Sequence, residues 1–212
     1  METKEFYKKL NELIPEPECE LEYKSVYQLL VAVILSAQCT DKRVNIVTKE
    51  LFKDYDSPEK MLTLSQSELE EKIHSCGFYH NKAKNILSMS KDLIEKFDGQ
   101  VPQDLDKMQS LAGVGRKTAN VVYSEAFKGD AIAVDTHVLR VSNRLGFVKT
   151  DNPYKCELVL MKLFDKSKWG KLHLQLVHFG RYICKAIKPQ CEKCPFTDMC
   201  TYYAMNNTRY TM

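Results

Sequence analysis

Apolar residues recur along most of this chain at the spacing of helices that bury one face. Residues 82–97 are expected to form one such helix, whose apolar face comprises Ile86, Met89, Leu93 and Ile94. A second apolar run, residues 29–35, is far too short to span a bilayer and predicts a buried helix. The sequence has no alternating run of β-branched residues apart from the short segment 131–134, so it predicts an all-α protein.

Capping residues place the ends of the predicted helices. Ser25 with Gln28 resembles a capping box and opens a helix through Ser36. Glycines are scarce, and most stand where a helix is expected to end. Further helices are predicted from Thr40 or Asp41 to about Asp54, from Ser65 or Ser67 to before Gly77, and from Pro102 to Ser110.

Composition narrows the class of protein without identifying it. The chain has 212 residues, enough for one large core or two small ones, and 44% of them are hydrophobic. The net charge of +3 permits a nucleic-acid partner but does not establish one. Residues 1–10 are charged throughout and lack the apolar core of a secretory signal. We therefore expect a cytoplasmic protein, associated with the nucleoid if its source is prokaryotic.

A quartet of cysteines lies near the C-terminus: Cys184, Cys191, Cys194 and Cys200. Four thiolates in so short a segment can converge on an iron–sulfur cluster or on zinc. Two disulfides are the alternative, which fits poorly with a reducing compartment. The spacing favours iron–sulfur over zinc only weakly, because zinc sites prefer two separated Cys-x2-Cys pairs and one occurs here. An iron–sulfur electron carrier is a further reading, although the spacing differs from that of ferredoxins.

Residues 111–119 have the pattern of a helix–hairpin–helix, two helices joined by a glycine-containing turn. Gly113 and Gly115 permit positive φ and the close approach of another backbone. The N–H groups at the start of the following helix can bind a phosphate. The alternative is a plain glycine turn between core helices, since short glycine motifs recur by chance.

Two residues are candidates for chemistry. Lys117 lies in the first turn of the second hairpin helix, where the helix dipole and partial burial would lower its pKa and leave a nucleophilic amine. The alternatives are a lysine that contacts a phosphate and an ordinary surface lysine. Asp135 is expected to be the N-cap of a helix that ends at Gly146, and the same carboxylate can face a pocket. His137 is expected to be structural or to support Asp135.

The chain resembles the endonuclease III family of DNA repair glycosylases over nearly its whole length. The resemblance rests on the order of several motifs, together with the pair Lys117 and Asp135. These motifs are Leu35–Asp41, Gly77–Ala83, Leu111–Asn120, Val134–His137 and the cysteine quartet. The resemblance implies a monomeric, bifunctional glycosylase and lyase that acts on duplex DNA containing oxidised pyrimidines or abasic sites. It also implies that the four cysteines bind a [4Fe–4S] cluster.

The fold that the resemblance implies has two helical lobes flanking a DNA-binding cleft. One lobe would be a six-helix barrel with the helix–hairpin–helix, residues 19–129. The other would be a discontinuous iron–sulfur cluster domain of residues 1–18 and 130–212. Lys117 and Asp135 would come from the two lobes and meet at the cleft.

The resemblance also implies a mechanism. Lys117 would attack C1′ of a nucleotide flipped out of the duplex and displace its base, with electrostatic support from Asp135. The resulting Schiff base would permit an elimination that cuts the strand on the 3′ side of the lesion. Gln38 would fill the space that the flipped nucleotide leaves, and Phe78 would be an apolar wedge between bases. A polar helix end for Gln38 and a core aromatic for Phe78 are the alternatives.

Phosphate contacts are expected from two further places. The hairpin backbone at Gly113, Val114 and Gly115 would hold a phosphate near the lesion. Lysines in and beside the cysteine segment would add contacts or form a solvated face; these are Lys185, Lys188 and Lys193.

Two residues depart from the family pattern, and two rival functions stay open. Ala112 stands where Pro is usual, which loosens the turn, and Phe78 replaces the common Leu wedge. A mismatch-specific glycosylase of the same superfamily is one rival, but its adenine-mismatch members lack a lysine at the position of Lys117. A non-catalytic DNA-binding module, with Lys117 as a phosphate contact, is the other.

Overall fold

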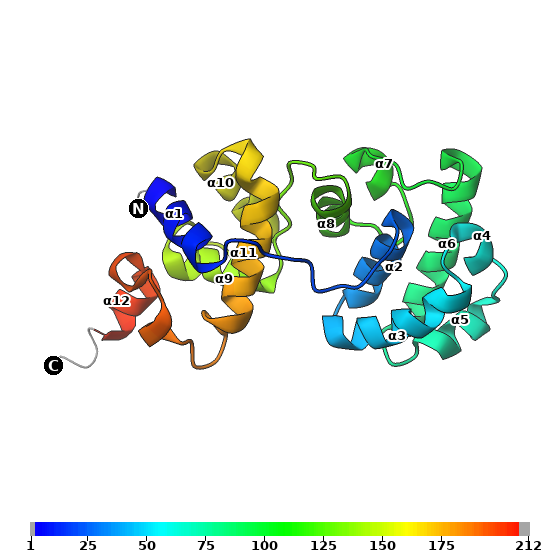
Figure 1. Ribbon diagram of the computed structural model, residues 1–212, viewed down its shortest axis with the longest axis horizontal. Coiled ribbons are helices and arrows are strands. Elements are labelled where there is room, and N and C mark those ends of the chain that lie inside the picture. Colours follow the sequence, from blue (N-terminus) through cyan, green and yellow to red (C-terminus); the bar gives the residue numbers. More distant parts are fainter. Residues whose placement is uncertain (1–2, 208–212) are drawn as a thin grey trace. The chain divides into compact units, whose positions relative to one another are not determined.

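Every regular element of residues 3–207, the part of the chain that the computed structural model describes, is a helix (Figure 1). The all-α prediction is therefore confirmed for these residues. The α-helices are α1 (Thr3–Leu13), α2 (Val26–Ser36), α3 (Asp41–Asp54), α4 (Pro58–Met61), α5 (Gln66–Ile73), α6 (Tyr79–Phe97), α7 (Leu105–Gln109), α8 (Arg116–Ala126), α9 (Thr136–Leu145), α10 (Pro153–Leu163), α11 (Trp169–Tyr182) and α12 (Thr201–Asn207). Three short 3-10 helices are η1 (Lys166–Lys168), η2 (Cys191–Lys193) and η3 (Thr197–Met199). Over the described residues, no helix is both long and apolar enough to cross a membrane.

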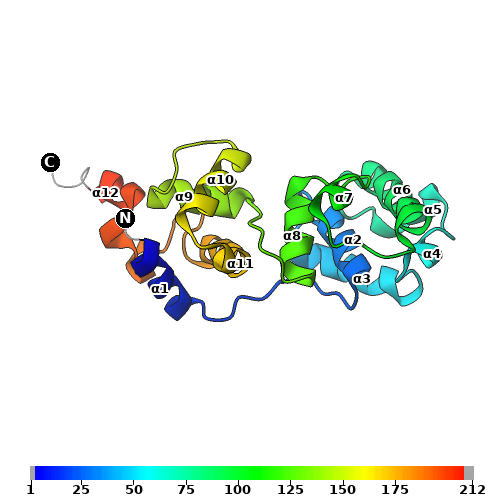
Figure 2. The same ribbon diagram turned by 90° about the horizontal axis from the view of Figure 1, so that it is seen from above.

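The helices form two compact units, each with its own hydrophobic core (Figure 2). The inserted unit comprises residues 19–129 and contains helices α2 to α8. The discontinuous unit comprises residues 3–18 together with residues 130–207, so α1 belongs with α9 to α12.

Helix α2 is the centre of the inserted unit. It packs against α3, α6 and α8, and every residue from Tyr27 to Leu35 is buried. This burial explains why residues 29–35 are apolar on all sides. The predicted start of α2 is confirmed, since the Ser25 side chain accepts a hydrogen bond from the Gln28 N–H at 3.2 Å. The reciprocal bond differs from a standard capping box, because Gln28 accepts from the N–H of Lys24 at 2.7 Å.

Helix α6 begins at Tyr79, three residues before the predicted start at Lys82. Lys82 therefore lies inside the helix, and its side chain is buried with only 5% exposed. Its Nζ donates hydrogen bonds to the carbonyl oxygens of Leu35 and Ala37, both at 2.8 Å. These two carbonyls lie at the C-terminal end of α2, where backbone oxygens have no partner within the helix. A single buried ammonium thus joins the first turn of α6 to the end of α2.

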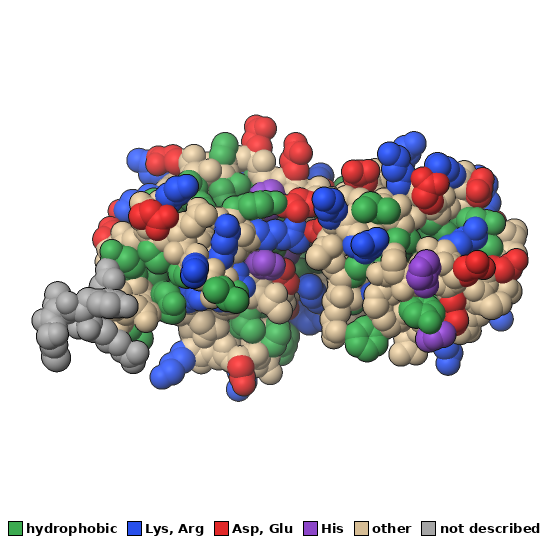
Figure 3. Space-filling model, turned by 90° about the horizontal axis from the view of Figure 1, so that it is seen from below, with side chains coloured by type: hydrophobic (Ala, Val, Ile, Leu, Met, Phe, Trp, Pro, Cys, Tyr) green, Lys and Arg blue, Asp and Glu red, His purple; other side chains and the backbone are tan. Residues whose placement is uncertain are grey.

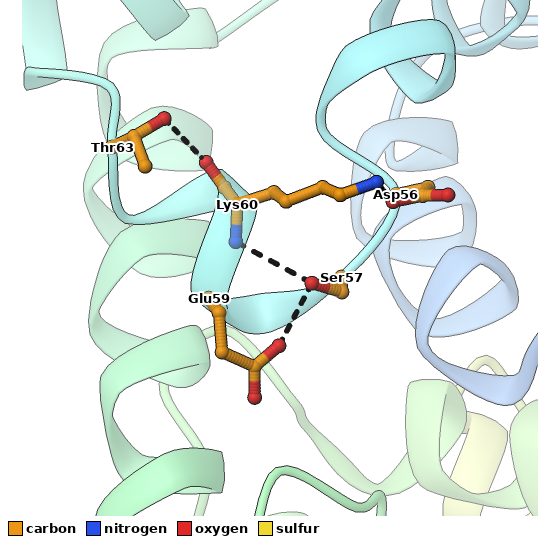
Figure 4. Close-up of polar contacts among 5 residues, drawn as sticks. All are labelled: Asp56, Ser57, Glu59, Lys60 and Thr63. Atoms are coloured by element: carbon orange, nitrogen blue, oxygen red, sulfur yellow. Dashed lines mark hydrogen bonds and ion pairs between the residues drawn. The ribbon is translucent and has the colours of Figure 1, made fainter.

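Short side-chain caps start the two smallest helices. At α4 the Ser57 hydroxyl accepts from the N–H of Lys60 at 3.4 Å and donates to Glu59 at 2.8 Å (Figure 4). At α7 the side chain of Asp104 accepts from the N–H of Lys107 at 2.8 Å. This cap sets the start at Leu105, so the prediction that Pro102 opens the helix was wrong.

Aromatic rings hold the two parts of the discontinuous unit together. Phe6 of α1 is fully buried, with its ring centroid 4.8 Å from that of Phe147 and 4.7 Å from that of Phe196. Phe196 is itself fully buried and stands between Cys194 and Cys200. The N-terminal helix and the cysteine segment, almost the whole chain apart in sequence, therefore share one core.

We expect Lys82→Ala to lower the free energy of unfolding by about 1–3 kcal/mol, because the buried carbonyl of Leu35 and the partly buried carbonyl of Ala37 lose their donor. Lys84→Ala removes an exposed lysine from the same helix and should change the free energy of unfolding by less than about 0.5 kcal/mol. Urea unfolding of the two variants checks the difference. Equal, small losses would show that the Lys82 bonds contribute little.

Candidate DNA-repair active site and cluster loop

The four C-terminal cysteines line a single pocket of the discontinuous unit. Their pocket is also lined by Leu145, Phe179 and Tyr202, which shield it with apolar surface. None of the eight cysteines forms a disulfide, so the pairing of these thiols with one another does not occur here. The arrangement leaves all four sulfurs available to a metal group.

The donor set of this pocket fits a polynuclear cluster. Within residues 3–207, no group of three or more His, Cys, Asp or Glu side chains is placed to hold a single metal ion, as zinc would require. Four thiols that line one pocket are the donor set that a [4Fe–4S] cluster takes. Burial raises the pKa of the Cys194 thiol to about 11, so the bound metal must drive its deprotonation.

Two arginines of α9 hold the backbone of the cysteine segment. Arg140 donates to the carbonyl oxygens of Gly180 at 2.8 Å and of Cys184 at 3.1 Å. Arg144 donates to the carbonyl oxygens of Lys185 at 2.6 Å and Ala186 at 2.9 Å, and to the sulfur of Cys184 at 3.5 Å. Neither arginine was predicted from the sequence. The signal that the sequence offered was their spacing: two arginines four positions apart lie on the same face of the helix that Asp135 was predicted to cap.

The hairpin turn lies between α7 and α8, as the helix–hairpin–helix pattern predicts. Gly113 has a φ of +76°, and a Cβ there would meet the Asn85 side chain at 2.8 Å, so only glycine fits. Gly115 differs, because its φ is −84° and the space beside it is open. The N–H of Val114 already donates to the carbonyl of Leu111 at 3.1 Å. The hairpin N–H groups that remain candidates for a phosphate are therefore those of Gly113 and Gly115.

Lys117 occupies the first turn of α8, two residues after the N-cap Gly115. Its side chain is exposed, so the partial burial expected from the sequence was wrong. The physical reason is that α8 buries the opposite face, which includes Ala119 and Val122. The exposed amine stands at the end of the helix where the backbone dipole is positive.

Asp135 is the N-cap of α9, as predicted, and its Oδ1 accepts from the N–H of Val138 at 2.8 Å. The carboxylate is thereby held in one orientation while remaining partly exposed. His137 packs against α11, where a Cβ on Gly180 would meet the Cβ of His137 at 2.9 Å. Its Nδ1 lies 3.2 Å from a guanidinium nitrogen of Arg140, and burial lowers the pKa of its imidazole. These contacts favour a structural role for His137.

Gln38 and Phe78 stand on two adjacent loops of the inserted unit. Both have left-handed backbones, with φ of +54° for Gln38 and +58° for Phe78. A Cβ on Gly77 would lie 4.0 Å from the carbonyl oxygen of Gln38, which places the two loops side by side. Phe78 is 63% exposed, which argues against the alternative of a core aromatic. Strained, exposed loops of this kind often carry function.

The lysines of the cysteine segment are all exposed, namely Lys185, Lys188 and Lys193. Acidic side chains are exposed too: Figure 3 shows Lys and Arg side chains mixed with Asp and Glu side chains on one face of the molecule. This mixture agrees with the small net charge of +3. Exposed lysines can bind phosphate, but the same exposure is expected of lysines that only form a solvated surface.

Comparisons with known proteins show the family of this chain. Residues 31–166 match the HhH-GPD superfamily of base excision DNA repair proteins, and residues 184–200 match the iron–sulfur binding domain of endonuclease III. Endonuclease III of Bacillus subtilis (strain 168) is 50% identical over 193 residues, which are 91% of this chain and 88% of that protein. Endonuclease III of Escherichia coli (strain K12) is 41% identical over 198 residues, 93% of this chain and 94% of that protein.

Solved structures of endonuclease III also resemble this chain. A trapped endonuclease III–DNA covalent intermediate, an estranged-adenine complex, matches with a TM-score of 0.93 and 44% identity. The match covers 98% of this chain and 99% of that chain. The predicted cofactor is confirmed as well, because the family carries a [4Fe–4S] cluster and the cysteine quartet lies in the matched iron–sulfur domain. The chain belongs to the endonuclease III family, the base-excision-repair DNA glycosylases with AP lyase activity.

Proposed function

We propose that this chain removes oxidised pyrimidines from duplex DNA and cuts the strand at the abasic site through a Schiff base on Lys117. The observation that carries the proposal is the exposed amine of Lys117 in the first turn of α8. It directly follows a hairpin turn with open space at Gly115. A substrate phosphate at the hairpin would bring the neighbouring sugar to this amine.

The reaction uses the amine as a nucleophile. The nitrogen of Lys117 attacks C1′ of the flipped nucleotide, and the bond from C1′ to the damaged base breaks with the base as leaving group. The sugar ring then opens to give an iminium at C1′. Loss of a proton from C2′ and departure of the 3′ phosphate complete the elimination. Water finally hydrolyses the Schiff base and releases the lysine.

Asp135 is the proposed source of electrostatic support for this step. Its carboxylate would stabilise the oxocarbenium character that the sugar gains as the base departs. It would also accept a proton from the amine of Lys117. The hydrogen bond from the Val138 N–H supports this role, because it fixes one oxygen and leaves the other for the substrate.

DNA recognition follows from the exposed loops. Phe78 is proposed to insert between bases, and Gln38 to occupy the gap opposite the orphaned partner base. The hairpin N–H groups of Gly113 and Gly115 and the exposed Lys188 and Lys193 are proposed to bind phosphates. The substrate is then duplex DNA with oxidised pyrimidines or abasic sites, bound by one copy of the chain in the cytoplasm.

The cysteine quartet gives the protein a structural metal group. When bound, the [4Fe–4S] cluster supplies iron–thiolate bonds to Cys184, Cys191, Cys194 and Cys200. The contacts of Arg140 and Arg144 with the carbonyls of this segment fix the loop that these bonds close. The exposed Lys188 and Lys193 are thereby presented from a rigid loop.

We expect borohydride to trap a covalent adduct between the wild-type protein and a duplex carrying thymine glycol, because it reduces the Schiff base. Lys117→Ala should give no adduct while retaining DNA binding. Lys107→Ala, which removes an exposed lysine from α7, is the matched control and should trap normally.

The same experiment distinguishes the two rival functions. Base release without an adduct in the wild type would indicate a monofunctional glycosylase, as in a mismatch-specific relative. Binding with neither adduct nor base release, across several lesions, would leave a non-catalytic DNA-binding module.

Phe78→Ala should weaken binding to a duplex with an abasic-site analogue by about tenfold, because the exposed ring no longer stacks between bases. Phe78→Leu keeps an apolar wedge and should bind within a few-fold of the wild type. Fluorescence anisotropy measures both affinities. Equal affinity of all three proteins would exclude an inserted ring.

Cys194→Ser should remove the iron and the visible absorbance of the purified protein, because the cluster loses one of its four thiolate ligands. Cys19→Ser changes a partly buried cysteine of the inserted unit and should retain both. Iron and sulfide assays on the two variants check this. Full iron content in Cys194→Ser would place the cluster ligand elsewhere.

A further inference from the structure

Two cysteines outside the cluster lie together beneath the loops that carry Gln38 and Phe78. Cys39 directly follows Gln38, and Cys76 stands two residues before Phe78. The segments that carry them lie side by side, since a Cβ on Gly77 would be 4.0 Å from the carbonyl oxygen of Gln38, and the two thiols interact although 37 positions separate them. Neither is in a disulfide, and neither belongs to the cysteine quartet. A pair of interacting thiols in a DNA repair enzyme needs a physical account.

The backbone around the pair is fixed from several sides. The N–H of Cys39 donates to the carbonyl of Ser36 at 3.0 Å, and the N–H of Cys76 donates to the carbonyl of Ile73 at 2.8 Å. Lys82 donates to the carbonyls of Leu35 and Ala37 and so ties α6 to the segment before Cys39. The two sulfurs therefore stay close without a covalent bond.

The two thiols differ in access and in charge environment. Cys39 is partly exposed, whereas Cys76 is fully buried. Burial, with a further contribution from the interaction with Cys39, raises the pKa of Cys76 to about 11, so this thiol is inert by itself. The cationic side chains of Lys82 and Arg43 act electrostatically on Cys76 and favour its thiolate. Cys39 is thus the sulfur that a small oxidant reaches first, with Cys76 in place to react second.

We propose that Cys39 and Cys76 form a reversible disulfide site that responds to hydrogen peroxide and links the Gln38 loop to the Phe78 loop. The sulfur of Cys39 attacks one peroxide oxygen and the O–O bond breaks. Cys39 becomes a sulfenic acid, and the other peroxide oxygen leaves as water with the thiol proton. The sulfur of Cys76 then displaces the hydroxyl, which takes the thiol proton and leaves as a second water. Peroxide receives the two electrons that the two thiols lose.

The bond would act on DNA binding, a consequence that rests on the proposed roles of Gln38 and Phe78. A disulfide holds its sulfurs about 2.05 Å apart, much closer than two thiols without a covalent bond. The two loops would be drawn together at residues that already have left-handed backbones. Insertion of both side chains into a duplex would then be impeded, and affinity for damaged DNA falls.

The test uses the full-length, cluster-containing protein treated with limiting hydrogen peroxide, followed by non-reducing peptide mass spectrometry. We expect a cross-linked peptide pair that contains Cys39 and Cys76, lighter by two hydrogens and cleaved by dithiothreitol. It should be absent in Cys39→Ala and in Cys76→Ala and unchanged in Cys19→Ala, the control in the same unit. Cys39→Ala replaces a partly exposed side chain, so its fold is maintained even where Cys76→Ala is destabilised. Oxidation of Cys39 to sulfinic acid without the cross-link would overturn the proposal.

The same samples report on DNA binding. Oxidised wild type should bind a duplex with an abasic-site analogue about tenfold more weakly, with full recovery in dithiothreitol. Peroxide-treated Cys39→Ala should keep its affinity, which excludes damage to the cluster as the cause. A cross-link with unchanged affinity would overturn the effect on DNA binding. Failure of the reduced wild type to bind would instead refute the proposed function.

Discussion

Two guanidinium groups on one helix organise the discontinuous unit. Arg140 and Arg144 direct their N–H groups at the carbonyls of residues 180 and 184–186, which a loop cannot satisfy by itself. Planar guanidiniums suit this task because they donate in several directions at once and stay charged. The segment from the last turn of α11 to Ala186 is shaped by these bonds. The thiols then converge on their pocket from a backbone that is already constrained.

The same helix carries the proposed catalytic carboxylate. Asp135 caps the N-terminus of α9, while Arg140 and Arg144 lie further along the same helix. A rigid helix therefore joins the carboxylate to the cluster loop through a few hydrogen bonds. Loss of the cluster would remove the bonds that close the loop, while the hydrogen bonds of Arg140 and Arg144 would still hold the loop to α9. Active sites need such firm support from the residues around them.

Helix caps, which depend on neighbouring residues in the sequence, were predicted far better than tertiary contacts. Ser25 and Thr40 start their helices as predicted, because a cap depends on residues within one turn. The start of α6 was predicted three residues too late, because its N-cap Phe78 has a left-handed backbone and no capping side chain that could be recognised in the sequence. The burial of Lys82 was missed as well, and partial burial was wrongly expected of Lys117, although the surface alternative for Lys117 was correct. Each depends on which face of a helix meets a neighbour, and composition favours the surface for any lysine.

The aromatic core that joins α1 to the cysteine segment constrains how the chain folds as it is made. Phe6 leaves the ribosome early, but its ring partners Phe147 and Phe196 are synthesised much later. The inserted unit holds all of its own helices and can complete its core first. Helix α1 must meanwhile remain unpaired, with Phe6 and Leu10 uncovered. Synthesis of the segment around Phe196 is thus the step that lets this core close, so the metal group can mature only after that segment has been made.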